Sequence, residues 1–124
     1  MVNKLEVDFL HTDDRGTICQ ISSIPIAQVN YLFTRRSAKR GCHYHKINRE
    51  IFYVIEGRLE LTAQRFDDRT KKETYRFQTG DLFVIEPFVV HDFSFSEDTK
   101  MLVMYDKGVE LPDNSKDIFP AEVS

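Results

Sequence analysis

The sequence predicts a small all-β domain built as an antiparallel barrel or a sandwich of two sheets. Three observations predict it: short stretches in which apolar and polar residues alternate, turn residues between those stretches, and the absence of a long amphipathic helical pattern. Ten phenylalanines and five tyrosines agree, because aromatic side chains pack well on a pleated surface. The length of 124 residues fits a single domain over residues 1–124.

Alternation of period two marks four of the expected strands, at residues 29–33, 59–63, 91–95 and 101–105. Residues 51–55 are apolar on both parities, which is typical of a central strand covered on both faces. Turn signals lie at 13–16, 56–57, 66–69 and 79–81. The polar end, residues 106–124, contains two prolines, and we expect a loop or short segment that packs on the barrel or on a partner subunit.

The composition argues against several classes of protein. Hydrophobic residues make up 41% and charged residues 30%, and no apolar run approaches the length of a membrane span. The first residues show no secretory pattern, and two cysteines, Cys19 and Cys42, suit a reducing compartment. A net charge of -3 is not typical of nucleic-acid binding. We therefore expect a cytoplasmic protein that binds neither a membrane nor nucleic acid.

Positive charge is nevertheless concentrated in one stretch. Residues 35–49 hold six cations: Arg35, Arg36, Lys39, Arg40, Lys46 and Arg49. Such a run is usually a solvated loop. Here it brackets a pair of histidines, which favours a patch that receives an anionic ligand such as a phosphate.

Histidines and a glutamate form the candidate site. His43 and His45 are two residues apart, so on a strand they point to the same face. Glu50 has the opposite parity, but residues 46–49 look like a turn, and a turn allows Glu50 to begin the next strand and face the same interior. A second block, with a turn at Pro87, brings His91 inward on the face of Phe93 and Phe95.

Three imidazoles and one carboxylate in an apolar barrel predict a site for a divalent metal such as Zn, Fe, Mn or Ni. The same groups could transfer protons without a metal, because histidine titrates near neutrality. A lone inward histidine is usually structural, whereas the combination of all four residues with their flanking turns indicates a functional site.

These motifs resemble those of the cupin superfamily. His43-x-His45-x4-Glu50-x6-Gly57 is similar to its first motif, and Gly80…Pro87…His91 to its second. The chain departs where Ser37 and Phe88 stand in place of family glycines and where Pro87 sits one place late. The resemblance implies a double-sheet jelly roll, often dimeric, with His43, His45, Glu50 and His91 as metal ligands.

A finer resemblance points to sugar-nucleotide chemistry. The segment 40–46, Arg-Gly-Cys-His-Tyr-His-Lys, resembles one found in bacterial sugar-nucleotide ketoisomerases and epimerases of the cupin fold, as do the turns at 13–16 and 95–98. The resemblance implies a dTDP- or UDP-linked 4-keto-6-deoxyhexose as substrate and an isomerase or epimerase activity.

Isomerisation of a keto sugar moves a proton beside a carbonyl, so it needs a base, an acid and an oxyanion donor. His43 and His45 could remove and return the proton. Arg40 and Lys46 could hold the diphosphate or polarise the carbonyl. Tyr31 or Tyr44 could stack on the base or donate to the sugar; the parity of Tyr44 relative to the histidines favours Tyr31.

Glu50 argues against acid–base roles for His43 and His45. It completes a metal-ligand set, and a ligating imidazole has no free lone pair for proton transfer. Two alternatives therefore stay open: a metal-dependent dioxygenase or isomerase of a small acid, and a sugar- or metabolite-binding barrel without catalysis. An edge strand and an apolar outer face around Ile51, Tyr53 and Ile55 predict a homodimer.

Overall fold

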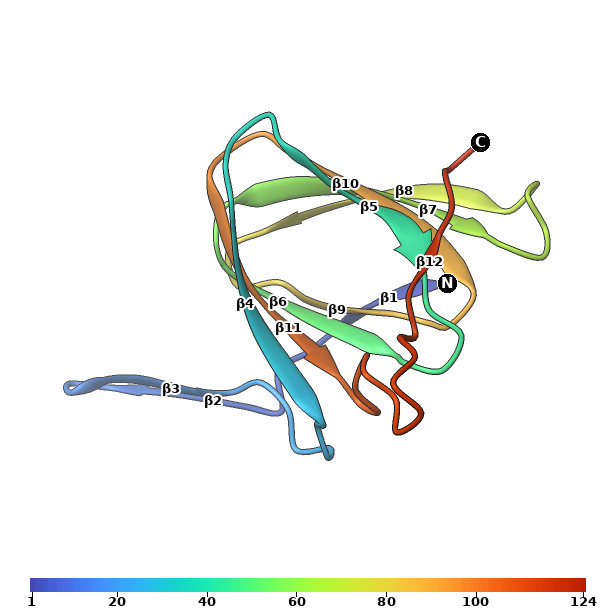
Figure 1. The fold of residues 1–124 in the computed structure, drawn as a ribbon. Helices are drawn as coiled ribbons and strands as arrows, with labels where there is room; N and C mark the ends of the chain where they lie inside the picture. Colours follow the sequence, from blue (N-terminus) through green and yellow to red (C-terminus); the bar gives the residue numbers. More distant parts are fainter.

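Two five-stranded antiparallel sheets lie face to face and form the body of the protein (Figure 1). The computed structural model describes residues 1–124. The first sheet has the order β1 (Val2–Leu5), β9 (Leu82–Ile85), β6 (Glu50–Glu56), β11 (Thr99–Tyr105) and β4 (Gln28–Thr34). The second has the order β12 (Phe119–Pro120), β5 (Lys39–Tyr44), β10 (Val89–Phe95), β7 (Arg58–Arg65) and β8 (Lys72–Gln78). The predicted all-β, double-sheet architecture is confirmed, and there is no apolar helix of membrane-spanning length.

The core lies between the two sheets and follows the alternation read from the sequence. Inward-facing side chains from β6, β7, β10 and β11 are buried in one cluster of 15 residues. In β10, Phe93 and Phe95 are buried in that cluster, and His91 is buried on the same face. The strand β6 has neighbours on both sides and is covered on both faces from Ile51 to Val54, as the apolar run at 51–55 predicts.

The outer face of β6 is covered by the chain itself. Ile51 belongs to a second small buried cluster with Leu82, Val84 and Met104, and the segment before β4 packs on it through Val7, Ile21 and Ile26. Tyr53 is half-buried in the same place. The expectation that Ile51, Tyr53 and Ile55 form an exposed dimer face is therefore wrong for the first two, and only Ile55 stays exposed.

The hairpin of β2 (Phe9–Asp13) and β3 (Gly16–Gln20) stands away from the barrel (Figure 1). Its two strands form a separate sheet, and the predicted turn at 13–16 joins them. Leu10 and Ile18 are 62% and 61% exposed, so the hairpin buries little of its apolar surface. A hairpin of this kind is marginally stable on its own, so its exposed apolar surface favours contact with a partner.

The C-terminal segment, residues 106–124, packs on the barrel of its own chain. Its strand β12 pairs with β5, and the last residue, Ser124, hydrogen-bonds to Gln64 of β7 through both its backbone and its side chain. This outcome confirms the first of the two placements expected for this segment.

Two residues, which stand where the motifs that this sequence resembles have glycine, adopt the backbone conformation that glycine favours. Ser37 has a φ of 71° and Phe88 a φ of 62°, both in the left-handed region. The Ser37 N–H donates to Phe95 O at 2.9 Å, and the Phe88 N–H donates to His45 O at 2.7 Å. The turn geometry of both motifs is therefore kept, at the cost of strain of about 1–2 kcal/mol for each non-glycine residue.

We expect Ser37→Gly to stabilise the protein by about 0.5–1 kcal/mol, because relief of this strain exceeds the entropy that glycine adds to the unfolded chain. The free energy of unfolding in urea measures it. Ala38→Gly is the matched control, since Ala38 is the exposed next residue and has no positive φ; this change should destabilise. Equal effects of the two substitutions would contradict the assignment of strain to Ser37.

Candidate active site

A β-bulge in β5 sets the direction of the side chains that face the interior. His43 lies opposite His91 of β10, but the next pair joins Asp92 to Gly41, so Cys42 is an extra residue. Gly41 and Cys42 both have positive φ, at 104° and 60°. A side chain on Gly41 would have its Cβ 2.4 Å from His91 O, so the bulge requires glycine there.

The bulge also turns Arg40 inward. Directly opposed residues of antiparallel strands point to the same face, and after the bulge Arg40 lies opposite Phe93, a core residue. Simple parity along the chain would put Arg40 and His43 on opposite faces. The extra residue brings them to the same side of the sheet.

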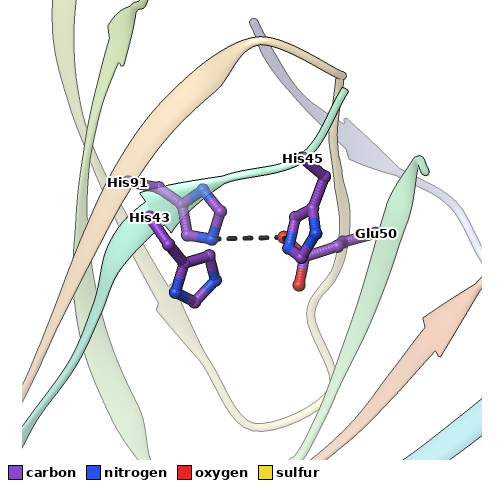
Figure 2. A group of neighbouring side chains, drawn as sticks. All are labelled: His43, His45, Glu50 and His91. Atoms are coloured by element: carbon purple, nitrogen blue, oxygen red, sulfur yellow. Dashed lines mark ion pairs between the residues drawn. The ribbon is translucent and has the colours of Figure 1, made fainter. Parts of the chain in front are cut away.

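Four side chains meet at one end of the barrel interior (Figure 2). His43 comes from β5, His45 from just after it, Glu50 from the first position of β6 and His91 from β10. One ligand atom from each residue lies within 4.8 Å of all the others. The turn at 46–49 reverses the chain between His45 and Glu50, as predicted, so the glutamate reaches the same interior.

Each imidazole is oriented by a backbone carbonyl. The Nδ1 of His43 lies 3.1 Å from Gly41 O, that of His45 lies 2.5 Å from Asp117 O, and that of His91 lies 3.0 Å from Val89 O. A carbonyl can only accept, so each Nδ1 carries the proton. The Nε2 atoms therefore present lone pairs to the interior.

This arrangement leaves buried acceptors facing one another. Oε1 of Glu50 lies 3.0 Å from His45 Nε2 and 3.1 Å from His91 Nε2, and all three atoms are buried without a hydrogen-bond donor. Lone pairs that face each other at this distance need a proton or a cation between them. Three imidazole nitrogens and a carboxylate oxygen are a donor set for a divalent metal, so the residues fit such an ion.

The electrostatics of the cluster keep the glutamate ionised and His43 neutral. Burial would raise the pKa of Glu50, but His91 and His45 outweigh it and hold that pKa below its ordinary value. Burial and the neighbouring His91 lower the pKa of His43 to about 4. Burial would lower the pKa of His45, but the neighbouring Glu50 carboxylate outweighs it and raises that pKa. An ionised carboxylate and a neutral imidazole are the forms that bind a metal.

The cluster opens on a cavity of about 250 Å³. Its walls are apolar where β4, β6, β10 and β11 face each other, and cationic where β5 begins. The lining residues with these two characters are Leu32, Phe52, Phe93 and Val103 on the apolar side and Lys39 and Arg40 on the cationic side. A ligand in this cavity therefore meets both the cluster and positive charge.

Tyr105 is a site residue that the sequence analysis missed. It lines the cavity, lies opposite Glu50 in the pairing of β11 with β6, and its ring stands edge-on to His45 at 5.7 Å. Burial and the Glu50 carboxylate raise the pKa of its phenol above its ordinary value, so it stays a proton donor. Its parity with Val103 was the signal that could have found it, because β11 alternates inward at 101, 103 and 105.

The predicted ligand-binding residues lie in different places. Arg40 lines the cavity, with Nε donating to Thr34 Oγ1 at 2.7 Å and Nη2 donating to Phe33 O at 3.2 Å. Lys46 does not line it; its Nζ lies 4.2 Å from the centre of the Phe119 ring. A role for Lys46 in holding a diphosphate therefore stays a prediction that the lining of this cavity does not support.

Tyr31 and Tyr44 also lie outside this cavity, because both have the parity that points away from the interior. Tyr31 is 59% exposed on the outer face of β4. Tyr44 is buried on the outside of β5, where it stacks on Phe66 at 4.3 Å and on Phe119 at 5.4 Å. Neither ring lines this cavity, and contact of Tyr31 or Tyr44 with the base or the sugar stays a prediction.

The protein is thus an antiparallel barrel of two sheets that brings three histidines and a glutamate together in its interior. Small barrels with such a site are a class that includes binding proteins and enzymes. The family model of the cupin domain matches residues 35–106, which contain all four residues. The chain belongs to the cupin family. No curated protein sequence matches the chain.

Solved structures share the fold at low sequence identity. One is the WlaRB TDP-quinovose 3,4-ketoisomerase of Campylobacter jejuni, with a TM-score of 0.78 and 18% identity over 96% of this chain and 92% of that one. A 3,4-ketoisomerase of Helicobacter canadensis has a TM-score of 0.75 and 17% identity over 91% and 87%. The 3′-monoepimerase ChmJ of Streptomyces bikiniensis, solved with dTDP-quinovose, has a TM-score of 0.72 and 19% identity over 91% and 67%. At these identities the likeness shows the fold.

We expect Gly41→Ala to destabilise the protein by about 2–4 kcal/mol, because it adds a clash with His91 O to the strain of a positive φ. Gly80→Ala is the control, since Gly80 has a φ of 87° and no atom within 4 Å of an added Cβ. The control should cost about 1–2 kcal/mol from strain alone. Urea unfolding measures both, and equal losses would contradict the close approach of β5 and β10.

Proposed function

We propose that this chain is a metal-holding isomerase or epimerase that acts on a nucleotide-linked 4-keto-6-deoxy sugar. The observation that carries the proposal is the convergence of His43, His45, Glu50 and His91 beside a cavity that Arg40 also lines. The folds of a ketoisomerase and an epimerase of nucleotide-linked sugars support it, although those activities belong to those proteins.

A divalent ion held by the four residues, with Zn, Fe, Mn and Ni as candidates, would supply a Lewis acid that polarises the sugar carbonyl. His43, His45 and His91 would bind it through Nε2, and Glu50 would bind through its carboxylate. The three Nδ1–H groups stay with their carbonyls and hold the rings in place.

Tyr105 is then the group of this chain best placed to give a proton to the substrate. Its phenol remains protonated beside Glu50, and it lines the same cavity. His43 and His45, expected from the sequence as acid and base, keep that role only if no metal binds, since the ion occupies the lone pair that a base uses.

The cavity has room for the sugar and leaves the nucleotide outside. Pockets that enclose drug-sized ligands span about 300–1,000 Å³, and this cavity measures about 250 Å³. A diphosphate on the sugar would lie beside Arg40, whose guanidinium can bind phosphate oxygens. The nucleotide, dTDP or UDP, would extend over the rim.

We also propose a homodimer in the cytoplasm. The hairpin β2–β3 leaves Leu10 and Ile18 exposed, and the neighbouring edge strand β4 leaves Val29, Tyr31 and Phe33 exposed on its outer face. A second copy would cover both surfaces, which a marginal hairpin and a bare strand edge require. Cys19 and Cys42 are free thiols, which suits a reducing compartment.

We expect purified protein to bind one divalent ion per chain and His91→Ala to lose it. Elemental analysis after loading with Zn, Mn, Fe and Ni measures the content. His11→Ala is the matched control, because His11 lies on the hairpin β2–β3, away from the cluster, and this variant should keep its metal. A wild-type protein that takes up no metal under any loading would overturn the metal site.

We expect the wild-type protein to exchange deuterium from heavy water into dTDP-4-keto-6-deoxyglucose at the carbon beside the carbonyl. Tyr105→Phe should slow this exchange by about 10²–10⁴-fold, since it removes a positioned proton donor, and should keep its metal. Tyr53→Phe is the control, because Tyr53 lies on the outer face of β6.

If the dTDP, UDP and GDP sugars are all inert, the isomerase proposal fails. Oxygen consumption with small acids or diols would then favour the metal-dependent dioxygenase, whereas binding of a sugar without turnover would favour a non-catalytic barrel.

A further inference from the structure

We infer that Asp117, in the C-terminal segment, is a positioning residue for the metal ligand His45, so that the metal site is complete only when this segment is docked. The inference rests on the metal site proposed above. It concerns a residue 72 positions from the histidine that it orients.

The three histidines differ in what orients them. His43 and His91 each use a carbonyl two residues before them on their own strand, Gly41 O and Val89 O. These contacts form whenever the strand forms. His45 has no such local partner and uses Asp117 O, at 2.5 Å. Its ring orientation therefore depends on a distant part of the chain.

The side chain of Asp117 ties that distant part to the turn between the ligand-bearing strands. Its carboxylate accepts from the backbone N–H groups of Lys46 at 2.8 Å, Ile47 at 3.1 Å and Asn48 at 2.9 Å, and from the Asn48 side-chain amide at 2.8 Å. The residue is 1% exposed. One carboxylate thus holds the turn that separates His45 from Glu50.

Asn48 adds a second link between the turn and the segment. Its side-chain amide also donates to Gly108 O at 2.8 Å, and its Oδ1 accepts from the Lys107 N–H at 3.0 Å. The C-terminal segment is therefore bound to this turn at two places, residues 107–108 and residue 117. Loss of the Asp117 carboxylate would remove the contacts nearest to His45.

Asp117→Ala keeps the backbone carbonyl but removes the side-chain contacts that hold it against His45. Once the carbonyl moves away, the Nδ1–H of His45 is buried without an acceptor, which is unfavourable enough to let the ring turn. Its Nε2 would then leave Glu50 and the other two imidazoles. The site would keep three ligands of four, on strands whose spacing is unchanged. Groups that orient a metal ligand typically change affinity about 10–100-fold when removed.

The experiment compares Asp117→Ala with the wild-type protein. Asp113→Ala is the matched control, because Asp113 is an exposed aspartate of the same segment and bonds only to Ser115. Titration with Zn²⁺ or Co²⁺ against a competing chelator measures metal affinity, and thermal unfolding of the metal-free protein measures stability. We expect Asp117→Ala to bind metal about 10–100-fold more weakly and Asp113→Ala to bind like wild type.

An affinity equal to wild type, with only a lower unfolding temperature, would show that Asp117 supports the fold alone and would overturn the inference. Asp117→Asn is the milder variant if Asp117→Ala does not fold, since it keeps the shape and one acceptor oxygen. It should give a smaller loss of metal affinity in the same direction.

Nitrogen-15 NMR of the histidine rings separates this inference from the function on which it rests. In the metal-free wild-type protein, His45 should be protonated at Nδ1 with slow exchange of that proton. In the Asp117 variants the exchange should be faster, while the His43 and His91 signals stay unchanged. A wild-type protein without metal affinity would contradict the proposed function, and the His45 signal would still decide the role of Asp117.

Discussion

The structure depends on one constraint, which is the presence of three acceptor nitrogens and an ionised carboxylate in a buried space. His45 Nε2 and His91 Nε2 face the same oxygen of Glu50 with no donor between them. Apolar packing alone would not select this arrangement, because each of these atoms loses water without gaining a hydrogen bond. The cluster therefore makes physical sense only with a cation, either a proton or a metal ion, at its centre.

Three of the unusual backbone positions, Gly41, Cys42 and Phe88, lie next to this cluster. The bulge at Gly41 and Cys42 allows β5 to approach β10 closely and still present His43 opposite His91. Phe88 adopts a left-handed conformation, and its N–H binds the carbonyl of His45. Strain at these positions is retained where the surrounding contacts hold it, which is common at functional sites.

Local rules of the sequence predicted what depends on local geometry. The parity of His43 and His45, the turn before Glu50 and the inward face of β10 all follow from alternation and turn chemistry. Parity also explains why Tyr31 and Tyr44 lie outside the cavity, since both have the parity of the outer face. The inward direction of Arg40 needed the bulge, which adds a residue that no period-two pattern can register. The role of Asp117 could not be predicted from the sequence, because its contacts join positions 72 residues apart.

A metal ion occupies the imidazole lone pair that proton transfer would use, and the structure offers a different residue for each of these two tasks. The histidines whose Nδ1–H groups are held by carbonyls can offer only Nε2, and the Nε2 atoms of His45 and His91 lie beside Glu50. Tyr105 lies at the boundary, with its ring against His45 and its side chain lining the cavity. A protonated phenol there can give a proton to a substrate in the cavity, so acid catalysis does not have to compete with the ligands for the same lone pair.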